Sequence, residues 1–196
     1  QTVLERPYHL SYPLVFEYRG EWYMLPETGE NRSVEVYRCT HFPDQWEFHK
    51  TLLKDVAAFD ATLLEYDGRW WLFVTIAGQG KSTWDTLYLY YADSPLSDDW
   101  TPHPNNPLIL DVRSARMAGR FFLRDGNLFR PSQDSSIRYG HALNLNRVVT
   151  LTTTEYVEIL EQKLEPPFNS DMIAVHTYNF SNKWTLMDMQ IRRRKL

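Results

Sequence analysis

The chain has 196 residues, enough for a sizeable hydrophobic core, and we expect residues 1–196 to form a single domain. A hydrophobic fraction of 43% without an apolar run of about 18 residues favours a soluble globular protein without membrane insertion. The net charge of -4 argues against a nucleic-acid partner, and the lone Cys39 excludes an internal disulfide and a cysteine-based zinc site.

Three hairpins of similar sequence follow one another along the chain. Each combines an apolar strand, a tight turn that ends in glycine, and a second aromatic or apolar strand. A glycine-ended dipeptide between two such runs is the strongest short-range hairpin signal, because glycine accepts the positive φ of these turns. The copies are LVFEYRGEWYMLPET (14–28), TLLEYDGRWWLFVT (62–75) and RFFLRDGNLFRPSQD (120–134), and a fainter fourth, VHTYNFSNKWTLMD (175–188), has Ser181-Asn182 at its turn.

Further strands are predicted after the first two hairpins, at 33–40 and 46–53 and then at 86–93 and 100–110. Four strands per unit, at a spacing of roughly 50 residues, are typical of a β-propeller blade. We therefore expect an all-β, propeller-like fold with blade-like units at about 9–55, 56–110, 115–168 and 170–196. One helix is expected over 152–164, inserted in the third unit and ended by Pro166-Pro167, because a threonine cap and acidic residues precede apolar residues three to four apart.

Three to four blades do not close a ring, and an open propeller would leave strand edges exposed. We expect the ring to be completed by upstream sequence or by a second copy in a homo-oligomer.

Four stretches of the chain resemble a known family: 9–38, 59–75, 130–158 and 175–179. They are similar to the propeller domain at the N-terminal side of plant glucosamine inositolphosphorylceramide transferases and to related bacterial modules. The resemblance implies a five-bladed propeller with the shape of certain glycoside hydrolases. It implies no reaction of this domain, since the transferase chemistry of the plant enzymes is assigned to a separate domain.

Three carboxylates are candidates for catalysis: Glu27, Asp60 and Asp134. Two of them could act as a glycosidase pair, one donating a proton to the leaving oxygen and one activating water or attacking directly. Asp60 is the strongest candidate because it opens a blade, as an Asp-Pro step does in the hydrolases that the family resembles. Tyr12 stands where those enzymes carry a catalytic aspartate in the first blade, which argues against hydrolysis. A carboxylate that caps backbone N–H groups is the alternative role for Asp60.

Polar and aromatic residues near the predicted strand ends are candidates for ligand binding. Arginine can pair with carboxylate or phosphate, glutamine suits sugar hydroxyls, and exposed aromatic rings stack on sugars. The alternatives are an Arg-Asp pair that holds a loop and a structural histidine. The candidates are Tyr12, Arg130, Gln133, Arg138, Tyr139, His176 and Trp84, the last in the loop 78–85.

Three functions remain open from the sequence. The first is recognition of a saccharide or glycoconjugate in the axial funnel of the propeller, the second a glycoside hydrolase-like enzyme with paired carboxylates, and the third a protein-interaction scaffold. No metal site or other cofactor is predicted, because no ligand spacing supports one.

Overall fold

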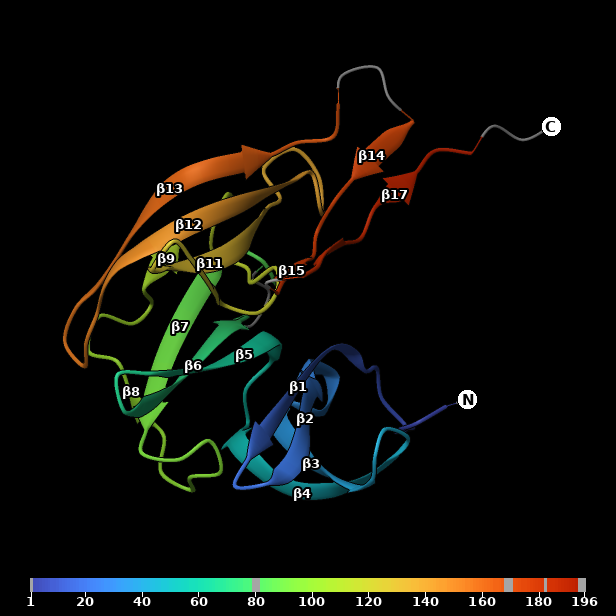
Figure 1. The fold of residues 1–196 in the computed structure, drawn as a ribbon, viewed down its shortest axis with the longest axis vertical. Coiled ribbons are helices and arrows are strands. Elements are labelled where there is room, and N and C mark those ends of the chain that lie inside the picture. Colours follow the sequence, from blue (N-terminus) through green and yellow to red (C-terminus); the bar gives the residue numbers. More distant parts are fainter. Residues whose placement is uncertain (1, 79–81, 168–170, 182, 194–196) are drawn as a thin grey trace. The chain divides into compact units, whose positions relative to one another are not determined.

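A computed structural model describes residues 2–78, 82–167, 171–181 and 183–193 (Figure 1). The chain is all-β: its regular elements in these ranges are strands, apart from one short 3-10 turn, η1 (Gly29–Asn31). No helix in the described part of the chain has the length and apolar character to cross a membrane. The contacts divide the chain into two compact units, residues 1–83 with 88–103, and residues 84–87 with 104–196.

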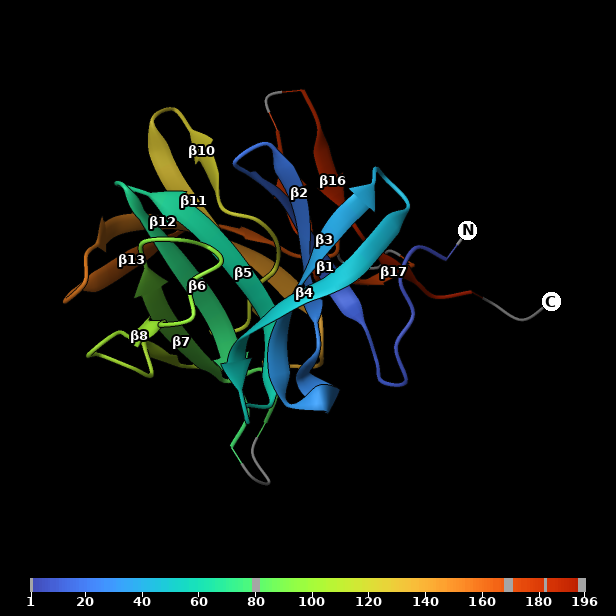
Figure 2. The same cartoon turned by 90° about the horizontal axis from the view of Figure 1, so that it is seen from below.

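The first unit begins with an antiparallel sheet in the order β1-β2-β3-β4, which runs from blue to cyan in Figure 2. Its strands are β1 (Ser11–Tyr18), β2 (Glu21–Glu27), β3 (Ser33–His41) and β4 (Gln45–Lys54). The next sheet has the order β5-β6-β7-β8, with β5 (Ala58–Tyr66), β6 (Arg69–Ile76), β7 (Thr86–Ala92) and β8 (Thr101–Pro102). Each sheet is therefore built from strands in sequence order, as the repeated hairpins predict.

The three predicted hairpin turns are present, and their backbone explains their sequences. Both central residues of each turn have positive φ, for example Asp67 at 52° and Gly68 at 69°. This is the geometry of a type I′ turn, whose twist matches that of the flanking strands. In the fourth copy, the hairpin of β15 (Tyr178–Phe180) and β16 (Thr185–Met187) flanks the expected turn, where Asn182 lies outside the described residues.

The first strands of the two sheets, β1 and β5, carry the same irregularity. The pairing of β1 with β2 shifts by one residue between Ser11 and Leu14, and the pairing of β5 with β6 shifts in the same way between Phe59 and Thr62. Tyr12 and Asp60 occupy these bulges with φ values of 46° and 49°. Non-glycine residues rarely adopt this conformation, so the sheets place both side chains by a locally strained backbone.

A hydrophobic core lies between these two sheets of the first unit. Apolar residues of β1, β2, β3 and β4 pack against the face of β5 and β6 that carries Trp70, Leu72 and Val74. Alternation along each strand sends these side chains to one face, and their burial is the main favourable contribution to folding.

The second unit is organised around the antiparallel sheet β10-β11-β12-β13. Its strands are β10 (Phe122–Arg124), β11 (Asn127–Asp134), β12 (Ala142–Leu151) and β13 (Tyr156–Leu164). β9 (Ile109–Leu110) pairs with Thr86 and Leu87 at the start of β7, which belong to this unit. Near the C-terminus, β14 (Met172–Ala174) pairs with β17 (Gln190–Ile191), and a second core joins Phe122, Phe129 and Leu143 to Tyr178.

The predicted helix over 152–164 is wrong, because these residues form a turn and β13. The hydroxyl of Thr152 does accept the backbone N–H of Glu155 at 2.9 Å, as a helix cap would. Here, however, the N–H of Thr152 also donates to the carbonyl of Glu155, which closes the hairpin loop between β12 and β13. Pairing with β12 along 143–151 then decides the conformation, since tertiary hydrogen bonding overrides a weak local propensity.

Candidate functional site

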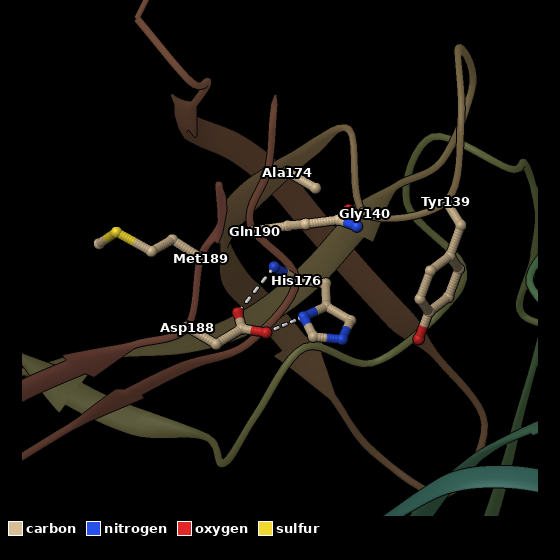
Figure 3. Close-up of a pocket in the computed structure, with 7 residues that line it drawn as sticks. All are labelled: Tyr139, Gly140, Ala174, His176, Asp188, Met189 and Gln190. Carbon is tan, nitrogen blue, oxygen red and sulfur yellow. Dashed lines mark hydrogen bonds and ion pairs between the residues drawn. The ribbon is translucent and has the colours of Figure 1, made fainter. Parts of the chain in front are cut away.

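The second unit contains a cleft of about 380 Å³ between the loop that precedes β12 and the C-terminal strands (Figure 3). Its volume is in the range of small-ligand sites, about 300–1,000 Å³. It is lined by Tyr139, Gly140, Ala174, His176, Asp188, Met189 and Gln190. In Figure 3, Asp188 and Tyr139 lie on opposite sides of the His176 ring, and the side chain of Met189 points away from them.

The backbone at Gly140 brings the loop against the C-terminal segment. The carbonyl of Gly140 accepts a hydrogen bond from the N–H of Val175 at 2.9 Å. Gly140 has a φ of 67°, and a Cβ there would come within 3.2 Å of the Cβ of His176. The guanidinium of Arg138 donates to the carbonyl of Ile173. A side chain at position 140 would therefore strain the backbone and crowd the cleft.

His176 and Asp188 form an oriented pair. One carboxylate oxygen of Asp188 accepts the N–H groups of His176 at 2.9 Å and Thr177 at 2.8 Å, and the other pairs with Nδ1 of His176. The acceptor on this side fixes the proton on Nδ1, so that Nε2 of the neutral ring is an acceptor on the opposite edge. Burial opposes ionisation of Asp188, but the two backbone N–H groups and the imidazole lower its pKa below the ordinary value.

An aromatic cluster forms one side of the cleft. Tyr139 is 43% exposed and meets His176 edge-to-face with a ring-centroid distance of 5.4 Å. Trp84 lies 5.9 Å from the Tyr139 ring, and the guanidinium of Arg116 lies 5.2 Å from its centroid. Arg116 lies over the ring, and the exposed part of Tyr139 offers apolar surface beside polar groups.

Three residues singled out from the sequence, Trp84, Tyr139 and His176, thus lie together. Residues 79–81 of the loop that carries Trp84 are outside the described residues. Sequence reasoning missed Asp188 and Gln190, although Asp188 ends the fourth hairpin copy and repeats the acid at the end of earlier copies. This position at the end of the repeat could have identified Asp188 as a candidate site residue.

Arg130 is wholly buried, and its hydrogen bonds are internal. Its guanidinium binds both carboxylate oxygens of Glu158, at 2.7 and 2.6 Å, and the carbonyl of Ser114 at 2.7 Å. These contacts support an ion pair that holds a loop, with Glu158 as the acid. We do not include Arg130 in the cleft.

The remaining candidates of the second unit make separate contacts. Asp134 accepts the N–H and hydroxyl of Ser136 and pairs with Lys163 at 3.0 Å. Burial opposes ionisation of Asp134, but these donors lower its pKa below the ordinary value. The side-chain amide of Gln133 donates to the carbonyl of Met117 at 2.8 Å.

The first unit brings Tyr12, Glu27 and Asp60 to neighbouring strand ends. A carboxylate oxygen of Glu27 accepts the N–H of Asp60 at 3.3 Å, and both side chains are buried. The Tyr12 hydroxyl lies 3.2 Å from that of Thr62. Glu27 therefore caps backbone at the second blade-like unit, which is the role that the sequence suggested as an alternative for Asp60.

Comparison with known proteins relates the chain to one family. The family model described as "Glucosamine inositolphosphorylceramide transferase 1, N-terminal" matches residues 1–193. Over 159 residues the chain is 40% identical to glucosamine inositolphosphorylceramide transferase 1 of Oryza sativa subsp. japonica, covering 80% of this chain. The Arabidopsis thaliana protein of the same name is 37% identical over 169 residues, or 85% of this chain. The match spans 21% of the length of each relative.

Sugar-processing enzymes are among the solved structures with a similar fold. The exo-beta-1,3-galactanase of Phanerochaete chrysosporium, solved with beta-1,3-galactotriose, matches with a TM-score of 0.63 and 9% identity, over 93% of this chain and 44% of that chain. The endo-arabinase of Bacteroides thetaiotaomicron matches with a TM-score of 0.55 and 17% identity, over 91% of this chain and 63% of that chain. At these identities the likeness concerns the fold alone.

Proposed function

Because the chain belongs to the family of N-terminal domains of glucosamine inositolphosphorylceramide transferases, we propose that it recognises the saccharide part of a glycoconjugate. The name of these relatives describes transfer of glucosamine, an amino sugar, to inositolphosphorylceramide, a sphingolipid with an inositol phosphate head group. The chain spans about a fifth of their length, 21%. A module of that size in such a system can hold the glycan while another domain carries out the transfer.

The cleft beside Tyr139 is the observation that carries this proposal. Sugar rings present C–H groups on their faces and hydroxyls on their edges. The exposed Tyr139 ring suits a face, Nε2 of His176 suits a donating hydroxyl, and the amide of the exposed residue Gln190 can donate and accept. Aromatic surface with a few converging polar groups is typical of small-ligand sites.

We also propose that the four-stranded sheets are blades of a five-bladed ring like that of the glycoside hydrolases. The TM-score of 0.63 to the galactanase and the repeated order of strands support this arrangement. The rest of the ring would come from a second copy or from sequence outside this chain. We also propose, as the sequence led us to expect, that the axial funnel of this ring takes part in recognising the saccharide.

Glycan binding can be tested with a glycan array followed by isothermal titration of the best soluble oligosaccharide. We expect Tyr139→Ala to weaken binding about tenfold, because the stacking face is lost. Trp184→Ala is the matched control, since Trp184 is an exposed aromatic residue of the same unit that does not line the cleft. Absence of binding by the unmodified protein, or equal affinity of the two variants, would contradict the proposal.

A hydrolase-like function is the second candidate, and the bulge at Asp60 beside Glu27 favours it. Backbone strain in non-glycine residues is common at functional sites. Turnover of aryl glycosides that Asp60→Asn and Glu27→Gln abolish, with glycan binding retained, would support this function. Turnover that survives both changes would exclude these carboxylates.

A further inference from the structure

We propose that the second unit has a second ligand site, a polar cleft over β11, β12 and β13 that binds a neutral polyhydroxylated ring. The cleft has a volume of about 360 Å³. It is lined by Asp111, Arg113, Ser114, Asp134, Asn144, Asn146, Glu158, Leu160 and Lys163. None of these residues lines the cleft beside Tyr139, so this site does not depend on the function proposed above.

The face of the sheet under this cleft departs from the repeat. Counted from the turn glycine, the fourth, sixth and eighth residues of the second hairpin are Leu72, Val74 and Ile76, whereas the third hairpin has Arg130, Ser132 and Asp134. β12 adds Asn144 and Asn146 opposite Ser132 and Arg130. A buried sheet face is normally apolar, and a buried polar face is the informative exception.

The charges around the cleft are neutralised internally. Glu158 is bound by the buried Arg130, Asp134 pairs with Lys163 at 3.0 Å, and Asp111 is held by two nitrogens of Arg113. Each carboxylate thus has a cationic partner that stands in the same region. A charged ligand would compete with these pairs for their partners, so a neutral ligand fits the cleft best.

Asn144 supplies an acceptor that the protein does not use. The residue is 4% exposed, and its Nδ2 donates to the carbonyl of Arg113 at 2.7 Å. Its Oδ1 is buried without a hydrogen-bond partner in the described part of the chain. A buried acceptor without a partner is unfavourable. Asn144 lines the cleft, and a side-chain movement that turns the buried Oδ1 toward it would let a ligand hydroxyl donate to this atom and remove the cost.

The lining also distinguishes the class of neutral ligand. It contains amides, carboxylates, one serine, the cations Arg113 and Lys163, and one exposed apolar side chain, Leu160, and it has no aromatic ring. Within the described ranges, no three His, Cys, Asp or Glu side chains are arranged to bind a metal ion. Hydrogen bonding to several hydroxyls is therefore the available recognition, as for a free cyclitol or hexose, or for the terminal unit of a glycan.

Ligand-observed NMR and isothermal titration with myo-inositol, glucose and maltotriose test the site, with inositol monophosphate as the charged comparison. We expect millimolar or tighter binding of at least one neutral probe, with shifts of the Asn144 side-chain amide signals. If maltotriose binds more tightly than glucose, the natural ligand is the terminal unit of a glycan. If maltotriose binds equally or more weakly, the natural ligand is a free cyclitol or hexose. Binding of the phosphate alone, or of no probe, overturns the proposal.

Variants on β13 locate the bound ring. Leu160→Trp fills the cleft from an exposed position and should weaken binding about tenfold. Ile159→Trp is the matched control, because Ile159 is similarly exposed, 50% against 54%, and points to the other face of the strand. Tyr139→Ala should leave this affinity unchanged. Equal affinities of the two tryptophan variants would overturn the assignment, whatever the outcome at Tyr139.

Discussion

Arg130 shows how a single residue determines the local structure of the second unit. It is among the largest side chains with an exposed fraction under 2% in the described part of the chain, and burial would lower its pKa. The carboxylate of Glu158 outweighs this effect and raises the pKa above its ordinary value, so the guanidinium stays charged. Such a pair constrains two strands and a loop, because either charge left alone would be strongly unfavourable.

Glu158→Leu should therefore reduce the free energy of unfolding by about 3–5 kcal/mol, because it leaves a buried guanidinium without its partner. Urea denaturation measures the loss. The matched control is Glu161→Leu. Glu161 lies on the same strand as Glu158 but forms an exposed ion pair with Arg147, so this change should reduce the free energy of unfolding by less than about 1 kcal/mol. The double change Arg130→Met with Glu158→Leu should restore part of the loss, and an additive loss would contradict this account.

The lowered pKa of Asp188 predicts how stability depends on pH. A carboxyl group whose folded pKa lies below its unfolded value stabilises the fold above the unfolded pKa, and the contribution is lost as pH falls through the folded pKa. Asp188→Asn should thus destabilise the protein near neutral pH, and the difference from the unmodified protein should shrink in acid. Because the side chain is 36% exposed, we expect about 1 kcal/mol or less. Urea denaturation at neutral and acidic pH measures it; a difference that grows in acid would contradict the assigned shift.

At the scale of the element, β13 shows that pairing with a neighbouring strand can outweigh the local preference of a segment for a helix. Residues 152–164 carry a helix-like start and a helix-like spacing of apolar residues, and still form a turn and an edge strand. Their backbone groups find partners in β12, while Val157 and Ile159 are β-branched and suit a strand.

The change in the free energy of unfolding caused by Val157→Ala has opposite signs for a strand and for a helix over these residues. In a strand, loss of the β-branched side chain should lower the free energy of unfolding by about 0.5–1 kcal/mol. In a helix, alanine would raise it by several tenths of a kcal/mol, since alanine has the highest helix propensity. Urea denaturation of the variant and the unmodified protein gives the sign, and a stabilised variant would contradict the strand.

At the scale of the whole molecule, each compact unit has its own hydrophobic core. Leu72 belongs to the core of the first unit and Leu143 to that of the second, and both are fully buried. Each unit is therefore stabilised by apolar contacts within its own core.

Leu72→Ala and Leu143→Ala should each lower the free energy of unfolding by about 2–5 kcal/mol, through lost burial and the cavity left behind. Hydrogen exchange resolved along the sequence should rise mainly in the unit that carries the substitution. Equal increases in both units after either change would indicate that the units unfold together.

The sequence by itself determined the repeated hairpins and hence the all-β fold. The signals are local: a glycine-ended turn requires positive φ, and alternating apolar residues define a buried face. It also pointed to Trp84, Tyr139 and His176 as residues for a ligand, because their chemistry is recognisable from their type and surroundings.

Only the tertiary structure decided which of these residues meet and which elements form. The turn and strand over 152–164 depend on β12, and the pair of Asp188 with His176 depends on the pairing of β14 with β17. The partner of Arg130 is Glu158, 28 residues away, and Asn144, with its unused and buried Oδ1, lines a cleft formed by several segments. Spacing along the chain does not contain such contacts, because they are made by residues that folding brings together from distant positions.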